Sequence, residues 1–92
     1  MDASAIVEQL KTALPDASFE VADSIDLHAT FYTSRHDVLG VLKELRDNPA
    51  LRFQLLAEVT AVDYWPREPR FELIYLLVSF EHRARVRLKV RL

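Results

Sequence analysis

One stretch decides how this chain folds: Arg85-Val86-Arg87-Leu88-Lys89-Val90-Arg91-Leu92. Cations and apolar residues alternate through it without a break, and a period of two is typical of a β-strand with one buried face. The other face then carries four positive charges in a row. The pattern stops in its middle, with no turn or polar tail after it. We therefore expect residues 1–92 to be a single domain that forms the N-terminal part of a longer protein.

The strand before it, residues 70–80, is apolar on both sides. Its two rows are Phe71, Leu73, Tyr75 and Leu77 on one side, and Ile74, Leu76, Val78 and Phe80 on the other. If residues 82 and 83 form a two-residue turn, Leu77 pairs with Leu88 on the core face and Leu76 pairs with Lys89 on the open face. A shift by one residue swaps the two rows. In either register an apolar row lies beside the row of cations.

Periodicity and turn chemistry predict the other elements. Apolar residues at helical spacing predict a helix over residues 3–14. A second helix follows the capping-box-like Ser34-Arg35-His36-Asp37 and stops at Asp47-Asn48-Pro49. Gly40 inside it is expected where the helix approaches the sheet. Alternating residues predict strands at 19–22, 25–32 and 53–63, before a proline-bounded loop at 65–69.

The predicted order is α-β-β-α-β-β-β. Two helices can cover only one face of a sheet this wide, so the fold class is α+β, a two-layer sandwich. It should hold a mixed five-stranded sheet with two helices on one face.

The uncovered face is the candidate site. An exposed apolar row with charge along its rim is typical of a docking surface. The equally supported alternative is that residues beyond 92 cover this face. Trp65, beside Pro66, is either a partner anchor or a cap on the edge of the core. The candidate partner interface consists of Ile74, Leu76, Val78, Arg85, Arg87, Lys89, Arg91 and Trp65. The isolated domain should hide the apolar row by self-association, through the face or the edge of its last strand.

Residue types argue against catalysis and cofactor binding. The chain contains no Cys and one Gly, so thiolate chemistry, cysteine ligation of metals and a glycine-rich phosphate loop are excluded from this segment. His28, His36 and His82 lack the spacing of a metal site, and Asp63 at a strand end is more typical of a turn than of a catalytic acid. We expect no catalytic residue, no cofactor and no metal. Net charge is -2, which does not favour a nucleic-acid binder.

Two stretches together resemble a known family: residues 55–64 (LLAEVTAVDY), and residues 70–79 (RFELIYLLVS) followed by 85–90 (RVRLKV). They are similar to the 30 kDa subunit of proton-pumping NADH:quinone oxidoreductase, respiratory complex I. The family's acidic signature segment is absent from this chain. Similar subunits occur in related membrane-bound hydrogenase-type complexes, which these residues do not separate from complex I.

The resemblance implies a non-catalytic scaffold subunit, which would brace the 49 kDa-type subunit that forms much of the quinone site. It implies no flavin, iron–sulfur cluster or nucleotide. The implied partners are other peripheral-arm subunits and no nucleic acid. The implied place is the cytoplasmic side of the bacterial inner membrane, reached only through the complex. The alternative function is a sheet-face binding module for RNA or another acidic ligand, which the cation row beside Tyr75 and Phe71 would suit.

Overall fold

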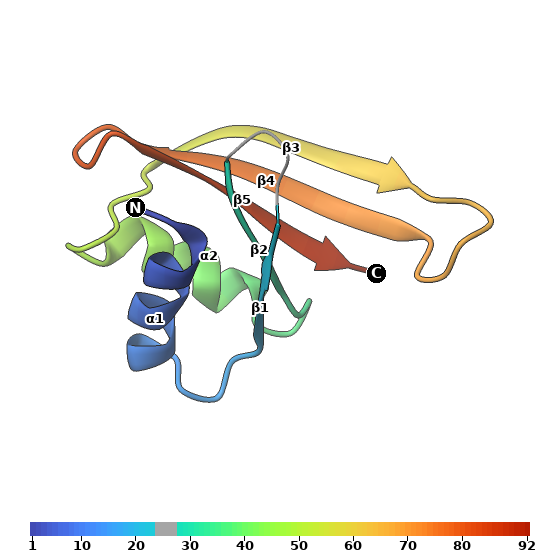
Figure 1. Cartoon of the computed structure of the whole chain (residues 1–92), viewed down its shortest axis with the longest axis horizontal. Helices are drawn as coiled ribbons and strands as arrows, with labels where there is room; N and C mark the ends of the chain where they lie inside the picture. Colours follow the sequence, from blue (N-terminus) through green and yellow to red (C-terminus); the bar gives the residue numbers. More distant parts are fainter. Residues whose placement is uncertain (24–27) are drawn as a thin grey trace.

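The computed structural model describes residues 1–23 and 28–92, with both helices on one side of a five-stranded sheet (Figure 1). Its elements are α1 (Ala3–Ala13), β1 (Phe19–Ala22), β2 (Ala29–Thr33), α2 (Val38–Asp47), β3 (Leu55–Asp63), β4 (Phe71–Ser79) and β5 (Ala84–Arg91). The predicted element order and the α+β sandwich are therefore confirmed. Residues 25–27 of the predicted second strand lie outside the described residues.

The strands lie side by side in the order β1-β2-β5-β4-β3. β2 and β5 run parallel, while the other neighbouring strands run antiparallel, so the sheet is mixed, as predicted. β5 therefore lies between β2 and β4, and the edges of the described sheet are β1 and β3. The expectation that the last strand offers an edge is wrong, because β5 is paired on both sides.

The β4–β5 hairpin keeps the predicted faces but not the predicted partners. Leu77 lies opposite Val86 and Leu76 lies opposite Arg87, two residues away from the predicted pairing. The connection holds residues 80–83, in which Arg83 adopts a φ of 51° and the Ser79 hydroxyl accepts the His82 N–H at 3.2 Å. Because the register differs by an even number of residues, every side chain stays on its predicted face.

The first helix begins and ends where its sequence signals place it. The Asp2 carboxylate accepts the Ala5 N–H at 2.9 Å and caps the helix. Ile6 and Leu10 are buried on one side of it. The helix ends at Ala13, two residues before Pro15.

The second helix starts after the predicted capping segment. The Ser34 hydroxyl oxygen accepts the Asp37 N–H at 3.2 Å, as in a capping box. The Asp37 carboxylate accepts the Ser34 hydroxyl at 2.7 Å and the Ser18 N–H at 3.1 Å, so it ties the helix start to the segment before β1. No atom lies within 4 Å of the place that a Gly40 Cβ would take. The expectation that Gly40 approaches the sheet is therefore wrong.

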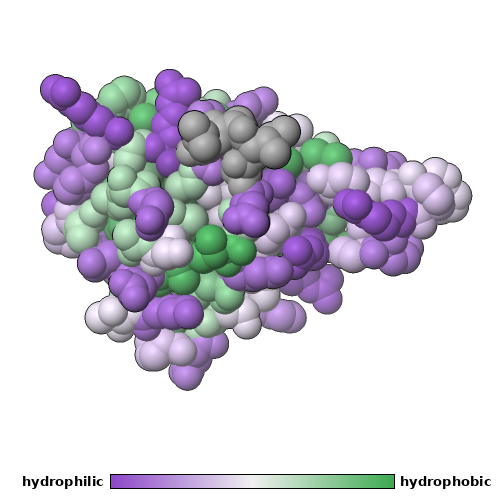
Figure 2. Space-filling view, in the orientation of Figure 1, coloured by the Kyte–Doolittle hydropathy of each residue, from purple (hydrophilic) through white to green (hydrophobic). Residues whose placement is uncertain are grey.

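The core lies between the helices and the middle of the sheet. Its largest fully buried side chains include Phe31, Phe53, Ile6, Leu10, Leu45 and Leu88. The β3–β4 hairpin extends past both helices (Figure 1), and Figure 2 shows the molecule tapering in that direction. Every side chain of β3 except the half-buried Val62 is exposed. None of the described helices is long and apolar enough to cross a membrane.

Candidate functional site on the open face of the sheet

The open face is the side of the sheet that the helices leave uncovered. On β4 it carries Ile74, Leu76 and Val78, which we call the apolar row; on β5 it carries Arg85, Arg87, Lys89 and Arg91, which we call the cation row. The ladder places Val78 opposite Arg85, Leu76 opposite Arg87 and Ile74 opposite Lys89. The members of the apolar row are half-buried, because the side chains of β5 and β3 flank them. Every predicted interface residue except Trp65 therefore lies on this face.

Glu72 lies on the same face as the apolar row and was not among the predicted site residues. It is only 5% exposed, and its carboxylate accepts hydrogen bonds from the hydroxyls of Tyr32 at 3.1 Å and Tyr64 at 3.2 Å. The ammonium of Lys89 lies 3.6 Å from the same carboxylate. These partners offset the cost of removing the charge from water. The available signal was a single charged residue within an otherwise apolar strand.

The two phenols that hold Glu72 titrate above their ordinary range. Burial raises the pKa of Tyr32, and its hydrogen bond to Glu72 raises it further. Burial also raises the pKa of Tyr64, with the nearby negative charge of Glu72 as the second cause. Both side chains therefore stay protonated as donors at neutral pH.

Part of the cation row is neutralised within the domain. The Arg91 guanidinium lies 2.8 Å from the Glu20 carboxylate and 3.7 Å from the centre of the Tyr32 ring. The hydrogen bond to Glu20 raises the pKa of Arg91. Arg87 lies 3.3 Å from Nδ1 of His28, and Lys89 pairs with Glu72. The exposed Arg85 is the member of the row nearest the β4–β5 turn.

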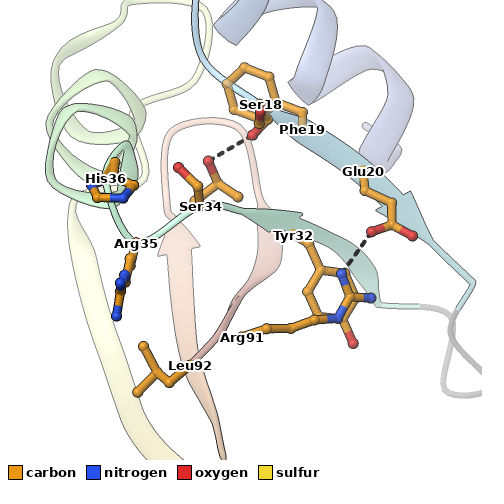
Figure 3. A pocket seen from close by; sticks show the side chains of 10 residues that line it. Ser18, Phe19, Glu20, Tyr32, Ser34, Arg35, His36, Arg91 and Leu92 are labelled. Atoms are coloured by element: carbon orange, nitrogen blue, oxygen red, sulfur yellow. Dashed lines mark hydrogen bonds and ion pairs between the residues drawn. The ribbon is translucent and has the colours of Figure 1, made fainter. Parts of the chain in front are cut away.

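A pocket of about 550 Å³ adjoins the Arg91 end of the open face (Figure 3). Its wall includes Ser18, Phe19, Tyr32, Arg35, His36 and Leu92. Figure 3 shows Arg91 directed across Tyr32 toward Glu20, so this cation is turned away from Arg35 and His36. Across the described residues, no group of three His, Asp or Glu side chains is placed to hold a metal ion.

Trp65 lies apart from both rows, in the loop that joins β3 to β4. Its side chain is 71% exposed, so it does not cap the core, and the alternative of a partner anchor is the one left for it. Its N–H donates to the Asp63 carboxylate at 3.0 Å, and the Arg70 guanidinium lies 5.0 Å from its ring centre. Asp63 also accepts two hydrogen bonds of 2.9 Å from Arg70, and these hold the pKa of Asp63 below its usual range. Asp63 is thus a turn-forming residue, as its position predicted.

Comparisons with known proteins agree on one family. The model of the "Respiratory-chain NADH dehydrogenase, 30 Kd subunit" family matches residues 31–92. The C subunit of the NADH-quinone oxidoreductase of Roseiflexus sp. (strain RS-1) is 43% identical over 98% of this chain and 51% of that protein. A protein of Acidiphilium cryptum, named as the C/D subunit of NADH-quinone oxidoreductase, is 39% identical over 95% of this chain and 16% of its own length.

A solved structure shares the fold. One chain of the membrane-bound sulfane sulfur reductase, an archaeal respiratory membrane complex, superposes with a TM-score of 0.71 and 27% identity. The match covers 96% of this chain and 48% of that one. The chain thus spans about half the length of the first relatives that it matches.

Proposed function

The chain belongs to the family of the 30 kDa subunit of respiratory-chain NADH dehydrogenase, and on this premise we propose that it serves as a scaffold without catalytic residues of its own. It forms part of the peripheral arm of an NADH:quinone oxidoreductase, on the cytoplasmic side of the bacterial inner membrane. There it braces the 49 kDa-type subunit that carries the quinone site, and it meets the membrane only through the complex.

The uncovered apolar row is the observation that carries this proposal. Ile74, Leu76 and Val78 lie on the face opposite the helical layer, and Leu55 of β3 extends the row with 42% of its surface exposed. Apolar area of this kind gains free energy when a partner removes it from water, at roughly 25 cal/mol per Å². A permanent neighbour is the simplest way to cover it.

The charges beside the row suit a protein partner better than a nucleic acid. Lys89 and Arg91 are already paired with Glu72 and Glu20, and each such pair lowers the positive potential that a phosphate backbone requires. The remaining charge, chiefly that of the exposed Arg85, would set orientation and encounter rate more than affinity.

The composition and one relative add support. The chain contains no Cys, so the segment offers no thiolate for an iron–sulfur cluster, which suits a bracing role. The double letter in the name of the Acidiphilium cryptum relative joins two subunits in one polypeptide. A fused neighbour supports a permanent contact.

Co-purification of the complex through a tag on the full-length subunit tests this function. We expect Leu76→Lys, which places a cation in the apolar row, to lower the yield of the 49 kDa-type subunit about tenfold or more, because an unpaired charge at a buried contact costs at least ~1.4 kcal/mol. Quinone reduction by NADH in membranes should fall in parallel. Val21→Lys is the control, since Val21 is 45% exposed on the other side of the sheet.

Thermal unfolding of the isolated full-length variants separates docking from folding. Should Leu76→Lys fail to fold, Leu55→Lys tests the same face at an exposed position. A folded variant that assembles as well as the control would overturn the docking role of this face. Salt-sensitive binding of RNA by the full-length protein, lost in these variants, would replace the scaffold with the RNA-binding alternative.

A further inference from the structure

β3 is an edge strand without the usual protection. It is nine residues long, its outer side has no neighbour in the described sheet, and nearly all its side chains are exposed. Natural edges are blunted by lysines, prolines, shortness or bulges. β3 contains no Lys, Arg or Pro, and its one register shift lies near its start, between Leu56 and Glu58. The segment from Glu58 to Asp63 is therefore a regular, open ladder.

The other edge differs in each respect. β1 has four residues, and α1 packs against it. An added strand would find a short ladder there, with a helix close by. The two edges thus form a natural pair for comparison.

On the helix side, β3 continues into a groove beside α2. The exposed Val59 and Leu56 lie on this side of the strand, at 52% and 48% exposure. A groove of about 330 Å³ lies next to Leu56, with Leu39, Leu42 and Phe53 in its wall and Lys43 and Arg46 among its lining residues. An extended segment along β3 would alternate its side chains, so one apolar row would lie over Val59, Leu56 and the groove.

The charge at the end of this groove is positive. Arg46 is occupied by Asp47, through contacts of 2.7 and 3.0 Å. Lys43 forms no hydrogen bond or ion pair with the residues that the structure describes. An acidic side chain on the added segment would meet this ammonium.

A second copy of the chain fits this charge poorly. On the helix side of its β3, the one acid is Asp63, which two hydrogen bonds already hold to Arg70. A second copy thus brings no unpaired carboxylate to Lys43 on that side of the strand. A segment from another protein meets no such restriction.

We propose that β3 accepts an extended segment of a neighbouring subunit as a further strand of the sheet, with apolar residues alternating over Val59 and Leu56 and an acidic residue beside Lys43. Strand addition of this kind draws affinity from main-chain hydrogen bonds and selectivity from alternate side chains. The donor is a subunit of the proposed complex, so the inference rests on the proposed function. It concerns the edge of the sheet rather than its open face.

Residue-resolved hydrogen exchange tests it, with the full-length protein measured alone and within the complex purified through its tag. In the protein alone, the outward amides of β3 should exchange rapidly. In the complex, every second amide between residues 58 and 63 should slow about tenfold or more, because a hydrogen bond forms at each. Docking on a sheet face does not produce this alternation, which makes the pattern diagnostic.

Matched variants assign the effect to the edge and to its charge. Val59→Lys should abolish the protection, whereas Val21→Lys, at similar exposure on the opposite edge, should leave it intact. Lys43→Glu should weaken the protection, and Lys11→Glu, on the exposed surface of α1, should not.

The outcomes are distinct. Other subunits that co-purify while β3 exchanges as in the isolated chain would overturn strand addition and leave the scaffold function standing. A tagged protein that co-purifies with nothing, and whose β3 stays unprotected, would overturn both. Alternating protection in the isolated protein that disappears on dilution, together with a dimer in sedimentation, would show that the occupant is a second copy and overturn the choice of a neighbouring subunit.

Discussion

The Tyr32 hydroxyl donates a 3.1 Å hydrogen bond to the Glu72 carboxylate across a whole strand, since Tyr32 lies on β2, Glu72 lies on β4 and β5 runs between them. Lys89 of β5 contacts the same carboxylate at 3.6 Å. One buried group therefore links three neighbouring strands at the side-chain level, in addition to their backbone ladders.

Replacement of Glu72 by Ala should destabilise the domain by about 1–3 kcal/mol, because it leaves two phenols and an ammonium without their acceptor. Chemical denaturation of the full-length protein gives the free energy of unfolding. Glu58→Ala on the exposed surface of β3 is the control and should stay within about 0.5 kcal/mol of the parent. Equal effects of the two changes would show that the Glu72 contacts add nothing to stability.

Stability should fall in alkali through Tyr32. Its pKa in the folded state is raised above the ordinary 10.0, first by burial and then by the hydrogen bond to Glu72. This contribution to stability is complete below pH 10, and it is lost as the pH rises through the folded-state value, because the unfolded chain releases the proton first. Unfolding free energies measured from pH 8 upward should decline less steeply in Tyr32→Phe than in the parent. Parallel curves would mean that Tyr32 ionises equally in both states.

Trp65→Ala should leave the melting temperature nearly unchanged. The side chain is 71% exposed in the β3–β4 loop, and such surface changes stay within about 0.5 kcal/mol. Calorimetry of the full-length variant provides the measurement. A loss of ~3 kcal/mol or more, the range for truncating a buried aromatic, would place the ring in the core. If Trp65 anchors a partner, the same variant assembles poorly although it folds well.

Gly40→Ala should stabilise the domain by about 0.5–1 kcal/mol. Gly40 lies within α2, and no atom lies within 4 Å of the added methyl group, so the gain in helix propensity is unopposed. The midpoint of urea unfolding should rise without a change in slope. A lower midpoint would indicate that α2 is packed more closely at this position than the structure describes.

The faces of the sheet could be predicted from local sequence, but its pairing could not. Alternation of Val86 with Arg87 fixes which side chains point to the core, and a change of turn length by two residues leaves that choice intact. The length of the turn itself was missed, because its left-handed residue is Arg83 rather than a glycine. The parallel pairing of β2 with β5 joins residues far apart in the sequence and has no local signal.

The candidate site follows the same division. The apolar and cation rows belong to neighbouring strands of one hairpin and were predicted together. The partners of Glu72 come from β2, β5 and the end of β3, so its burial depends on the finished sheet. Gly40 was misplaced because propensity describes the helix alone and does not indicate which side meets the sheet.

The central place of β5 has a consequence for synthesis on the ribosome. The nascent chain produces β1, β2, β3 and β4 first, as two separate ribbons that share no strand, and only β5 can join them. Val86 and Leu88, both fully buried, complete the core at that same moment. Until residue 91 has left the exit tunnel, the apolar sides of both ribbons remain open to water, and incomplete chains in this state are prone to aggregate. The domain thus folds late in translation, when its final strand emerges, rather than progressively from its first helix.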